Sequence, residues 1–220
     1  MLAEIGDRLR RHYGPLGWWP AASPFEVVVG AVLTQNTAWT NVERAIANLH
    51  AAGVLNPVAL SALPEPELAE LIRPSGTYRV KAKRLVGLLQ WLGSDWQARL
   101  AGDLDAVRAG LLAVPGIGPE TADAILLYAA GHPTFVIDAY TRRIMGRIGV
   151  TPGDDSYEGW RRLFMQALPP DVARYNEYHA GLVQLAKDHC RAKPVCPGCP
   201  LHAVCATGSA AELLAERPAA

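Results

Sequence analysis

Four cysteines are present in the chain, and all of them lie close together near the C-terminus. Their spacing is C-x5-C-x2-C-x5-C, from Cys190 through Cys196 and Cys199 to Cys205. Four thiolates in one compact loop are suited to converge on a soft metal ion or a metal–sulfur cluster. The spacing therefore predicts a metal site made by these four side chains.

The spacing allows three possible states of these cysteines to be compared: two disulfides, a zinc site and an iron–sulfur cluster. Two disulfides are disfavoured, because the sequence shows no secretory signal and no other cysteine, as expected of an intracellular protein with reduced thiols. Zinc ribbons usually present two C-x2-C pairs, and this loop has one, from Cys196 to Cys199. A [4Fe–4S] cluster tolerates the wide flanking gaps better, so the spacing favours iron–sulfur and leaves zinc as the alternative.

A second feature with chemical meaning is the segment VPGIGPETADAIL, residues 114–126. Glycines at 116 and 118 permit a tight turn with exposed N–H groups, and a helix is expected to begin near Pro119, a favoured first-turn residue. Main-chain donors at a helix N-terminus can hold a phosphate. The segment has the form of a helix-hairpin-helix, which binds a DNA backbone phosphate without needing a positive net charge. An ordinary helix–helix turn is the alternative.

Asp138 follows in the segment TFVIDAYTRRI, just before a predicted helix that carries Ile144 and Ile148. Taken alone, this aspartate is best explained as an N-cap.

Helices are the elements that must position these residues. The segment PFEVVVGAVL has apolar residues at helical spacing, Asp103 is a good N-cap for the next amphipathic segment, and Pro and Gly separate the segments. The β-branched run at 134–137 could form a strand, but it is isolated. We expect an all-α fold of about ten helices. The predicted stripe on the first of these segments consists of Phe25, Val28, Val29, Val32 and Leu33.

Composition limits the class of protein. With 220 residues, half of them hydrophobic, the chain can bury a substantial core, and no apolar run approaches the ~20 residues of a membrane helix. The 21 basic and 21 acidic residues give no net charge, so any DNA contact must come from local patches. We expect a monomeric protein, cytoplasmic and associated with the nucleoid. The candidate basic patches are Arg79, Lys81, Lys83 and Arg84; Arg142, Arg143 and Arg147; and Lys187, Arg191 and Lys193.

The hairpin, the segment V-I-D-A-Y-x-R-R and the cysteine loop, in this order and at these distances, resemble the helix-hairpin-helix DNA glycosylases of the endonuclease III superfamily over nearly the whole chain. That family has a hairpin L-P-G-V-G, a catalytic aspartate in V-D and often a [4Fe–4S] loop of C-x6-C-x2-C-x5-C, whose first gap is one residue shorter here. The resemblance implies two helical domains with a DNA-binding cleft between them. Residues 22–132 would carry the hairpin, and residues 1–21 with 133–220 would carry the cluster loop.

The resemblance assigns catalysis to Asp138. Its carboxylate would stabilise positive charge on the deoxyribose as the N-glycosidic bond breaks, and would orient or deprotonate water. Endonuclease III proper has a lysine two residues after the second hairpin glycine, which forms a Schiff base and cleaves the strand. Here Glu120 stands at that position, and a carboxylate cannot form an imine. A monofunctional glycosylase is therefore expected.

The expected partner is double-stranded DNA that contains damaged bases. Because the target bond is hidden in the duplex, the nucleotide must be flipped out and a side chain must fill the gap. The segment GAVLTQNTAWT has the form of the family's wedge, which makes Gln35 or Asn36 the candidate filler, with a polar helix terminus as the alternative. The expected hairpin contacts to DNA are Pro115, Gly116, Gly118, Glu120 and Thr121.

The segments WWP, GAVLTQNT, RPSGTY and KAKRL are similar to the 3-methyladenine DNA glycosylase III branch, which can lack the cluster loop. That branch holds a flipped alkylated base between aromatic rings, here Trp18, Trp19 and Trp39. A cationic purine such as 7-methylguanine would gain ~0.5–2 kcal/mol from an indole face. Core packing is the alternative role of these rings. Lys187 matches a pocket lysine of the branch that can be carbamylated.

Two other functions stay open. One is an endonuclease III-type glycosylase for oxidised pyrimidines. The other is a non-catalytic DNA-binding module, which Asp138 argues against, because a pure binder has no need of a carboxylate that faces the phosphate backbone.

Overall fold

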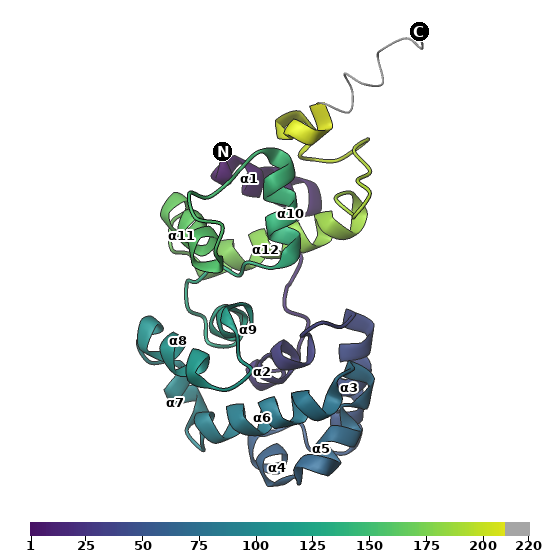
Figure 1. Ribbon diagram of the computed structural model, residues 1–220, viewed down its shortest axis with the longest axis vertical. Helices are drawn as coiled ribbons and strands as arrows, with labels where there is room; N and C mark the ends of the chain where they lie inside the picture. Colours follow the sequence, from purple (N-terminus) through teal and green to yellow (C-terminus); the bar gives the residue numbers. More distant parts are fainter. Residues whose placement is uncertain (210–220) are drawn as a thin grey trace. The chain divides into compact units, whose positions relative to one another are not determined.

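The structure of the protein is a computed structural model that describes residues 1–209 (Figure 1). Within these residues it is built of helices and contains no strand, which confirms the all-α fold class. The chain divides into two compact units, one of residues 19–132 and the other of residues 1–18 with the chain from Pro133 onward. The division into two domains with the limits 22–132 and 1–21 plus 133–220 stays a prediction.

Unit 19–132 is organised around α2, whose residues from Val27 to Leu33 are all buried together with Phe25. The predicted apolar stripe is confirmed, and the other faces of α2 are buried as well because α3, α6 and η2 pack around it. The elements of this unit are α2 (Pro24–Leu33), α3 (Trp39–Ala51), α4 (Pro57–Ala62), α5 (Glu65–Leu71), η1 (Arg73–Ser75), α6 (Tyr78–Leu92), α7 (Trp96–Leu100), α8 (Leu104–Ala113), α9 (Pro119–Ala124) and the π-helical turn η2 (Ile125–Ala129).

Local sequence signals set several helix ends. The Asp103 carboxylate accepts hydrogen bonds from the N–H groups of Asp105 and Ala106 at 3.1 and 3.0 Å, and α9 begins at Pro119, as predicted. The run at 134–137 is buried but forms no strand, and it has no regular secondary structure. Residues 1–209 contain twelve α-helices rather than about ten, because the turns also hold very short helices such as α4 and α7.

The second unit is formed by the first 18 residues and the part of the chain that follows His132. Its elements are α1 (Leu2–Tyr13), α10 (Ala139–Ile148), α11 (Tyr157–Ala167), α12 (Val172–Asp188) and η3 (His202–Val204). The helices α1 and α12 lie side by side (Figure 1), and the Tyr178 hydroxyl donates to the Leu2 carbonyl at 2.8 Å. A Cβ at Gly6 would stand 2.9 Å from the Tyr178 ring, so glycine allows this close approach. The N-terminal helix therefore belongs to the unit that carries Asp138 and the cysteines.

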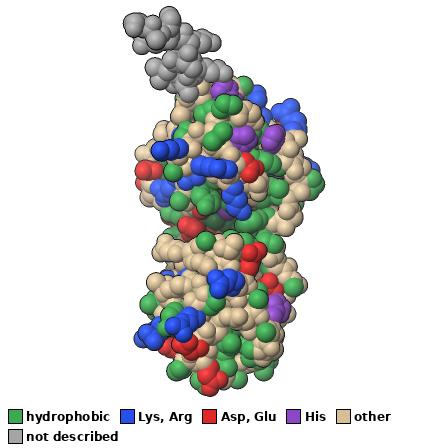
Figure 2. All heavy atoms as spheres, turned by 90° about the vertical axis from the view of Figure 1, so that its right-hand side faces the viewer, with side chains coloured by type: hydrophobic (Ala, Val, Ile, Leu, Met, Phe, Trp, Pro, Cys, Tyr) green, Lys and Arg blue, Asp and Glu red, His purple; other side chains and the backbone are tan. Residues whose placement is uncertain are grey.

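The distribution of apolar and charged side chains in the structure agrees with what the composition indicated. No helix among the described residues is long and apolar enough to span a membrane. On the face that Figure 2 shows, basic side chains occur in small groups beside acidic ones rather than as one continuous basic surface. On this face, any recognition of a phosphate backbone must therefore use local donors.

Candidate active site

The hairpin is formed by α8, a turn at 114–118 and α9. Gly116 has φ 86°, which favours glycine, whereas Gly118 has φ −90° and ψ 174°, which other residues also adopt. A Cβ at Gly118 would meet no protein atom within 4 Å. Nothing in the described fold requires glycine at 118, so this position leaves room for an outside group to approach the backbone. Glu120 lies exposed in the first turn of α9.

A buried ion pair holds the two hairpin helices together. Arg108 of α8 donates from Nε and Nη2 to the two carboxylate oxygens of Asp123 on α9, at 2.9 and 3.0 Å. The Asp123 side chain is fully buried and that of Arg108 is 11% exposed. Two parallel charge-assisted hydrogen bonds fix both distance and angle, so the turn between the helices is held in a defined geometry.

Gln35, a candidate gap filler, is bound to the hairpin in this structure. Its Nε2 donates to the Gly116 carbonyl at 3.1 Å and to the Thr121 hydroxyl at 2.9 Å, and its Oε1 accepts from Arg84 at 2.5 Å. Asn36 is exposed and has φ 52°, an unusual conformation for a residue other than glycine. The two candidates thus differ, because Gln35 would have to exchange three hydrogen bonds to enter DNA and Asn36 already faces solvent.

Lys81 is buried rather than part of a basic surface patch, so the prediction for this residue was wrong. Its Nζ donates to the Leu33 carbonyl at 2.8 Å and to the Ser75 carbonyl at 2.6 Å, and only 1% of the residue is exposed. Burial and then the charge of Arg84 lower the pKa of Lys81 to about 8. This ammonium joins the end of α2, just before Gln35, to the turn at η1.

Asp138 is the N-cap of α10, as predicted, and it also has a partner that the sequence did not indicate. Its Oδ1 accepts the Thr141 N–H at 2.7 Å, and its Oδ2 lies 3.5 Å from His179 Nε2 on α12. The side chains are 15% and 7% exposed. Burial alone raises the pKa of Asp138, but the charge and hydrogen bond of His179 and the bonds from Thr141 outweigh it, so the pKa lies below its ordinary value.

The predicted tryptophans divide between the two units. In unit 19–132, the Trp19 ring lies 5.3 Å from that of Trp39 and 5.4 Å from that of Tyr128, measured between centroids. Trp39 also donates to Glu43 at 2.9 Å. All three rings are half-buried, unlike Trp96, which is 9% exposed and belongs to the core. The Trp19–Trp39–Tyr128 cluster therefore retains accessible aromatic surface.

Trp18 belongs to the other unit, where it meets Lys187. The Lys187 ammonium lies 5.6 Å from the centroid of the Trp18 ring, within the range of a cation–π interaction. Trp18 is half-buried and Lys187 is exposed. A charged lysine on this indole face would repel a cationic ligand that approached the same face.

The cysteine loop is fastened to α10 by two arginines, which are therefore not free to form a phosphate-binding patch. Arg143 donates to the Cys190 carbonyl at 2.9 Å, and Arg147 donates to Cys190 Sγ at 3.2 Å. Arg147 also reaches the carbonyls of Arg191 and Ala192 at 2.6 and 2.8 Å. The loop thus starts from a fixed position on the helix that Asp138 caps.

All four cysteines are unbridged and half-buried. Burial raises the pKa of the Cys199 thiol, the Leu201 N–H lowers it in part, and the charges of the other three cysteines raise it further. The Cys199 thiol therefore interacts electrostatically with the other three cysteines. Among residues 1–209, no three His, Cys, Asp or Glu side chains meet the geometry for holding a single metal ion.

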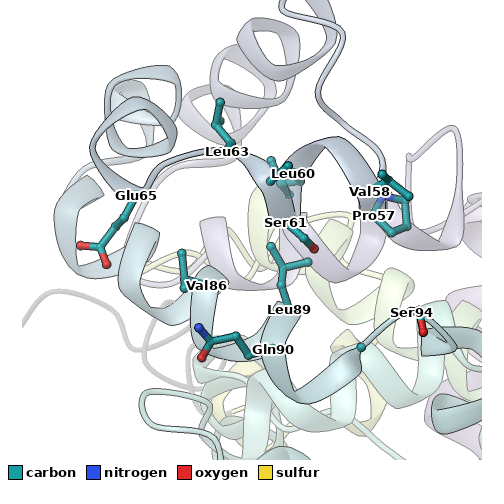
Figure 3. Close-up of a pocket in the computed structure, with 12 residues that line it drawn as sticks. Pro57, Val58, Leu60, Ser61, Leu63, Glu65, Val86, Leu89, Gln90 and Ser94 are labelled. Carbon is teal, nitrogen blue, oxygen red and sulfur yellow. The ribbon is translucent and has the colours of Figure 1, made fainter.

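An apolar pocket of about 590 Å³ lies away from all of these residues, between α4, α5 and α6 (Figure 3). Apolar side chains such as Leu60, Leu63 and Leu89 form much of its wall, and Glu65 is its charged residue. It contains none of the predicted site residues and offers no set of groups for acid–base chemistry.

The structure gathers the predicted residues into two sets, one in each unit. Unit 19–132 holds the hairpin, Gln35, Asn36, Trp19 and Trp39; the other holds Asp138, Trp18, Lys187 and the cysteines. Thr121 is 7% exposed and binds Gln35, so its hydroxyl faces the interior. The sequence did not indicate Tyr128 or His179, and it placed Arg84 in a basic patch without indicating its bond to Gln35. These roles depend on contacts between distant segments.

Proteins similar to this chain are found over nearly its whole length. A Methanocaldococcus jannaschii protein, provisionally named as a DNA repair glycosylase, is 43% identical over 210 residues, which cover 93% of this chain and 96% of the relative. The solved non-covalent complex of endonuclease III with DNA matches with a TM-score of 0.80 at 25% identity, over 97% of this chain and 99% of that chain. The 3-methyladenine DNA glycosylase of Helicobacter pylori, solved with 1,N6-ethenoadenine bound, matches with a TM-score of 0.71 at 29% identity, over 84% and 95%.

The family model described as HhH-GPD superfamily base excision DNA repair protein matches residues 29–170, a span that includes the second half of α2, the hairpin, Asp138 and α11. The chain belongs to this superfamily of base excision DNA repair proteins.

Proposed function

We propose that this base excision DNA glycosylase releases alkylated purines such as 3-methyladenine and 7-methylguanine from double-stranded DNA, and that it does so without cleaving the strand. The observation that carries this proposal is the Trp19–Trp39–Tyr128 cluster, in which indole and phenol rings stand 5.3 and 5.4 Å apart and keep accessible surface. Alkylated purines are electron-poor or cationic, and they stack well on such rings. The likeness to the Helicobacter pylori 3-methyladenine glycosylase supports the same substrate class.

The reaction assigned to this site is hydrolysis at the anomeric carbon. As the N-glycosidic bond breaks, the base leaves with the bonding electrons and positive charge develops on the deoxyribose. A carboxylate at Asp138 stabilises that charge and accepts a proton from the attacking water. Alkylation already weakens the bond, so little acid catalysis on the base is needed.

The absence of strand cleavage follows from Glu120. A lyase needs an amine that attacks the sugar and forms an imine, and a carboxylate cannot do so. Glu120 lies exposed in the first turn of α9, so the difference from endonuclease III falls on a residue at the hairpin surface.

DNA binding is assigned to the hairpin turn and the segment after α2. Main-chain N–H groups around Gly118 would hold a backbone phosphate, and the open space at its Cα allows the approach. Pro115 and Gly116 are exposed beside it. The flipped nucleotide leaves a gap that Asn36 or Gln35 would fill, the latter after releasing its bonds to Gly116 and Thr121.

The cysteine loop would hold a [4Fe–4S] cluster through its four thiolates. The donor set consists of four soft ligands, and the Arg147 N–H directed at Cys190 Sγ suits a sulfur that carries negative charge. When bound, the cluster supplies an iron–sulfur centre that can carry an electron and fixes the loop. Zinc is the alternative for the same thiolates.

A specific observation favours a second substrate class. Lys187 lies over the Trp18 ring, and its positive charge opposes a cationic base on that face unless the lysine is neutral or carbamylated. A neutral base meets no such repulsion. An endonuclease III-type glycosylase for oxidised pyrimidines is therefore the second candidate.

One experiment separates these functions. Duplex oligonucleotides, each with a single defined lesion, are incubated with the protein and analysed with and without alkali. Release of 3-methyladenine and 7-methylguanine with breaks only after alkali is the expected result. Preferential release of an oxidised pyrimidine would select the second candidate, and binding without release of any base would select a non-catalytic DNA-binding module.

A further inference from the structure

Both oxygens of the Asp138 carboxylate are engaged, by groups from two different helices. Oδ1 accepts the Thr141 N–H of α10 at 2.7 Å, and Oδ2 lies 3.5 Å from the Nε2 of His179 on α12. The first contact belongs to an ordinary N-cap. The second does not, because a capping carboxylate needs no ring nitrogen from another helix.

The position of His179 is unusual for a histidine whose role is only to fill space. It is 5% exposed, its ring lies 6.4 Å from that of Phe135, and its Nε2 lies 3.5 Å from Oδ2 of Asp138. Bringing a carboxylate into such surroundings favours its neutral form unless a cation or donor is beside it. Burial therefore makes the partner of this carboxylate important.

We propose that His179 is a positioning residue for glycosidic bond cleavage, which holds Oδ2 of Asp138 and keeps the carboxylate charged while Thr141 holds Oδ1. The proposal rests on the catalytic role assigned to Asp138 above. Fixing both oxygens leaves the carboxylate one orientation, which is what electrostatic stabilisation of a charged sugar requires. His179 acts through Asp138 and touches neither base nor sugar.

Groups from α10, α11 and the segment before α10 also lie near Asp138 or His179. From α11, the Tyr157 hydroxyl accepts the N–H of Ile137 at 3.3 Å, next to Asp138 in the chain. From α10 comes the Thr141 backbone, and from the segment before it the uncharged Phe135 ring. The charge and hydrogen bond of His179 lower the pKa of Asp138, so removal of His179 should raise the pKa of this carboxyl.

The test uses the full-length protein and the lesion duplex that the wild type cleaves fastest. Base release is measured in single turnover across a pH series for wild type, His179→Leu, His179→Gln and Asp138→Asn, and binding is measured on a duplex with a tetrahydrofuran abasic analogue. We expect His179→Leu to slow base release about 10- to 100-fold, with binding unchanged and the acid limb of the pH profile moved to higher pH. His179→Gln, whose amide can still donate, should retain more of the rate.

A matched control is Tyr178→Phe, which alters the adjacent residue of α12 by removing its bond to the Leu2 carbonyl. It should lower stability without changing the rate or the pH profile. If His179→Leu unfolds, the test rests on His179→Gln. A wild-type rate together with a wild-type pH profile in His179→Gln would overturn the proposal.

Two other outcomes separate this proposal from the one on which it rests. If Asp138→Asn is inactive but both His179 variants behave as wild type, His179 has no positioning role and Asp138 keeps its own. If Asp138→Asn is fully active, the catalytic role of Asp138 fails and that of His179 fails with it. In the Asp138→Asn background, His179→Leu should cause no further loss of rate, and an equal loss in both backgrounds would show a merely structural role.

Discussion

The side chain of Arg84 lies against the backbone of Gly116, so that a Cβ at Gly116 would stand 2.5 Å from Arg84 Nε. The same arginine donates to Gln35, which in turn binds the Gly116 carbonyl. The segment after α2 and the hairpin turn are therefore parts of one hydrogen-bonded structure within unit 19–132. DNA that engages one of them would act on the other.

Gly116→Ala should destabilise the protein by about 1–3 kcal/mol, because an alanine would be strained at φ 86° and would collide with Arg84. The measurement is the free energy of unfolding in denaturant. Gly118→Ala is the matched control, since φ is −90° there and a Cβ meets open space. It should leave stability unchanged but weaken DNA binding, and a loss of stability as large as that of Gly116→Ala would contradict this account.

Asp138→Asn should slow base release by at least about 100-fold with little change in DNA affinity, because the lost charge acts mainly in the transition state. Asparagine keeps the shape of aspartate and is itself a good N-cap, so α10 should keep its start. Single-turnover rates and binding to an uncleaved duplex test the two parts. Full activity in this variant would show that another group supplies the charge.

The same substitution gives a prediction on pH. The pKa of Asp138 is lower in the folded protein than its ordinary value, so its carboxylate stabilises the fold above about pH 4 and this contribution is lost as pH falls through the lowered pKa. The difference in unfolding free energy between wild type and Asp138→Asn should therefore shrink as the pH falls into the acid range. Denaturant unfolding at a series of pH values measures this difference. A difference that grows in acid would show that the pKa of Asp138 is raised in the folded protein rather than lowered.

Local signals explain what could be predicted from the sequence. The Asp103 cap, the start of α9 at Pro119 and the buried stripe of α2 each depend on residues within one or two helical turns. The capping role of Asp138 follows from the same kind of signal, because its partner Thr141 is three residues away.

Other features could not be predicted because they depend on contacts between distant segments. Lys81 looked like part of a basic run, but it is buried by carbonyls from residues 33 and 75. His179 is 41 positions after Asp138 and sits in an ordinary amphipathic pattern, so nothing near it in the sequence indicates a partner. From the sequence, Arg147 likewise looks like an exposed charge, because its contact with Cys190 exists only in the folded structure.

Glu120 predicts the absence of a covalent intermediate. Borohydride should trap no adduct between the wild-type protein and lesion DNA, and strand breaks should appear only after alkali, because no amine stands at this position. Glu120→Lys places an amine in the first turn of α9 and should make trapping detectable. Efficient trapping by the wild type would mean that another amine, such as a lysine elsewhere or the N-terminus, attacks the sugar.

The cysteine loop predicts a coloured protein. Purification without oxygen should give a yellow-brown sample with broad absorption near about 400 nm and about four irons per chain. Arg147→Met removes the donors to Cys190 Sγ and to two loop carbonyls, so it should speed the loss of colour in air. Colourless protein with one zinc per chain would show that the thiolates hold zinc instead.

The aromatic cluster should decide which base is released, because stacking acts on the flipped base before the bond breaks. Trp19→Ala or Trp39→Ala should slow release of 7-methylguanine more than release of a neutral lesion, by up to about 30-fold for a cation–π loss of ~2 kcal/mol. Trp91→Ala is the matched control, since Trp91 is also half-buried but packs against Gly110 of α8, outside the cluster. It should lower the melting temperature without altering the preference. If the Trp19 and Trp39 variants release cationic and neutral bases with equally reduced rates, these rings do not select the base by its charge. The neutral pyrimidine that the Lys187–Trp18 contact favours then becomes the better substrate.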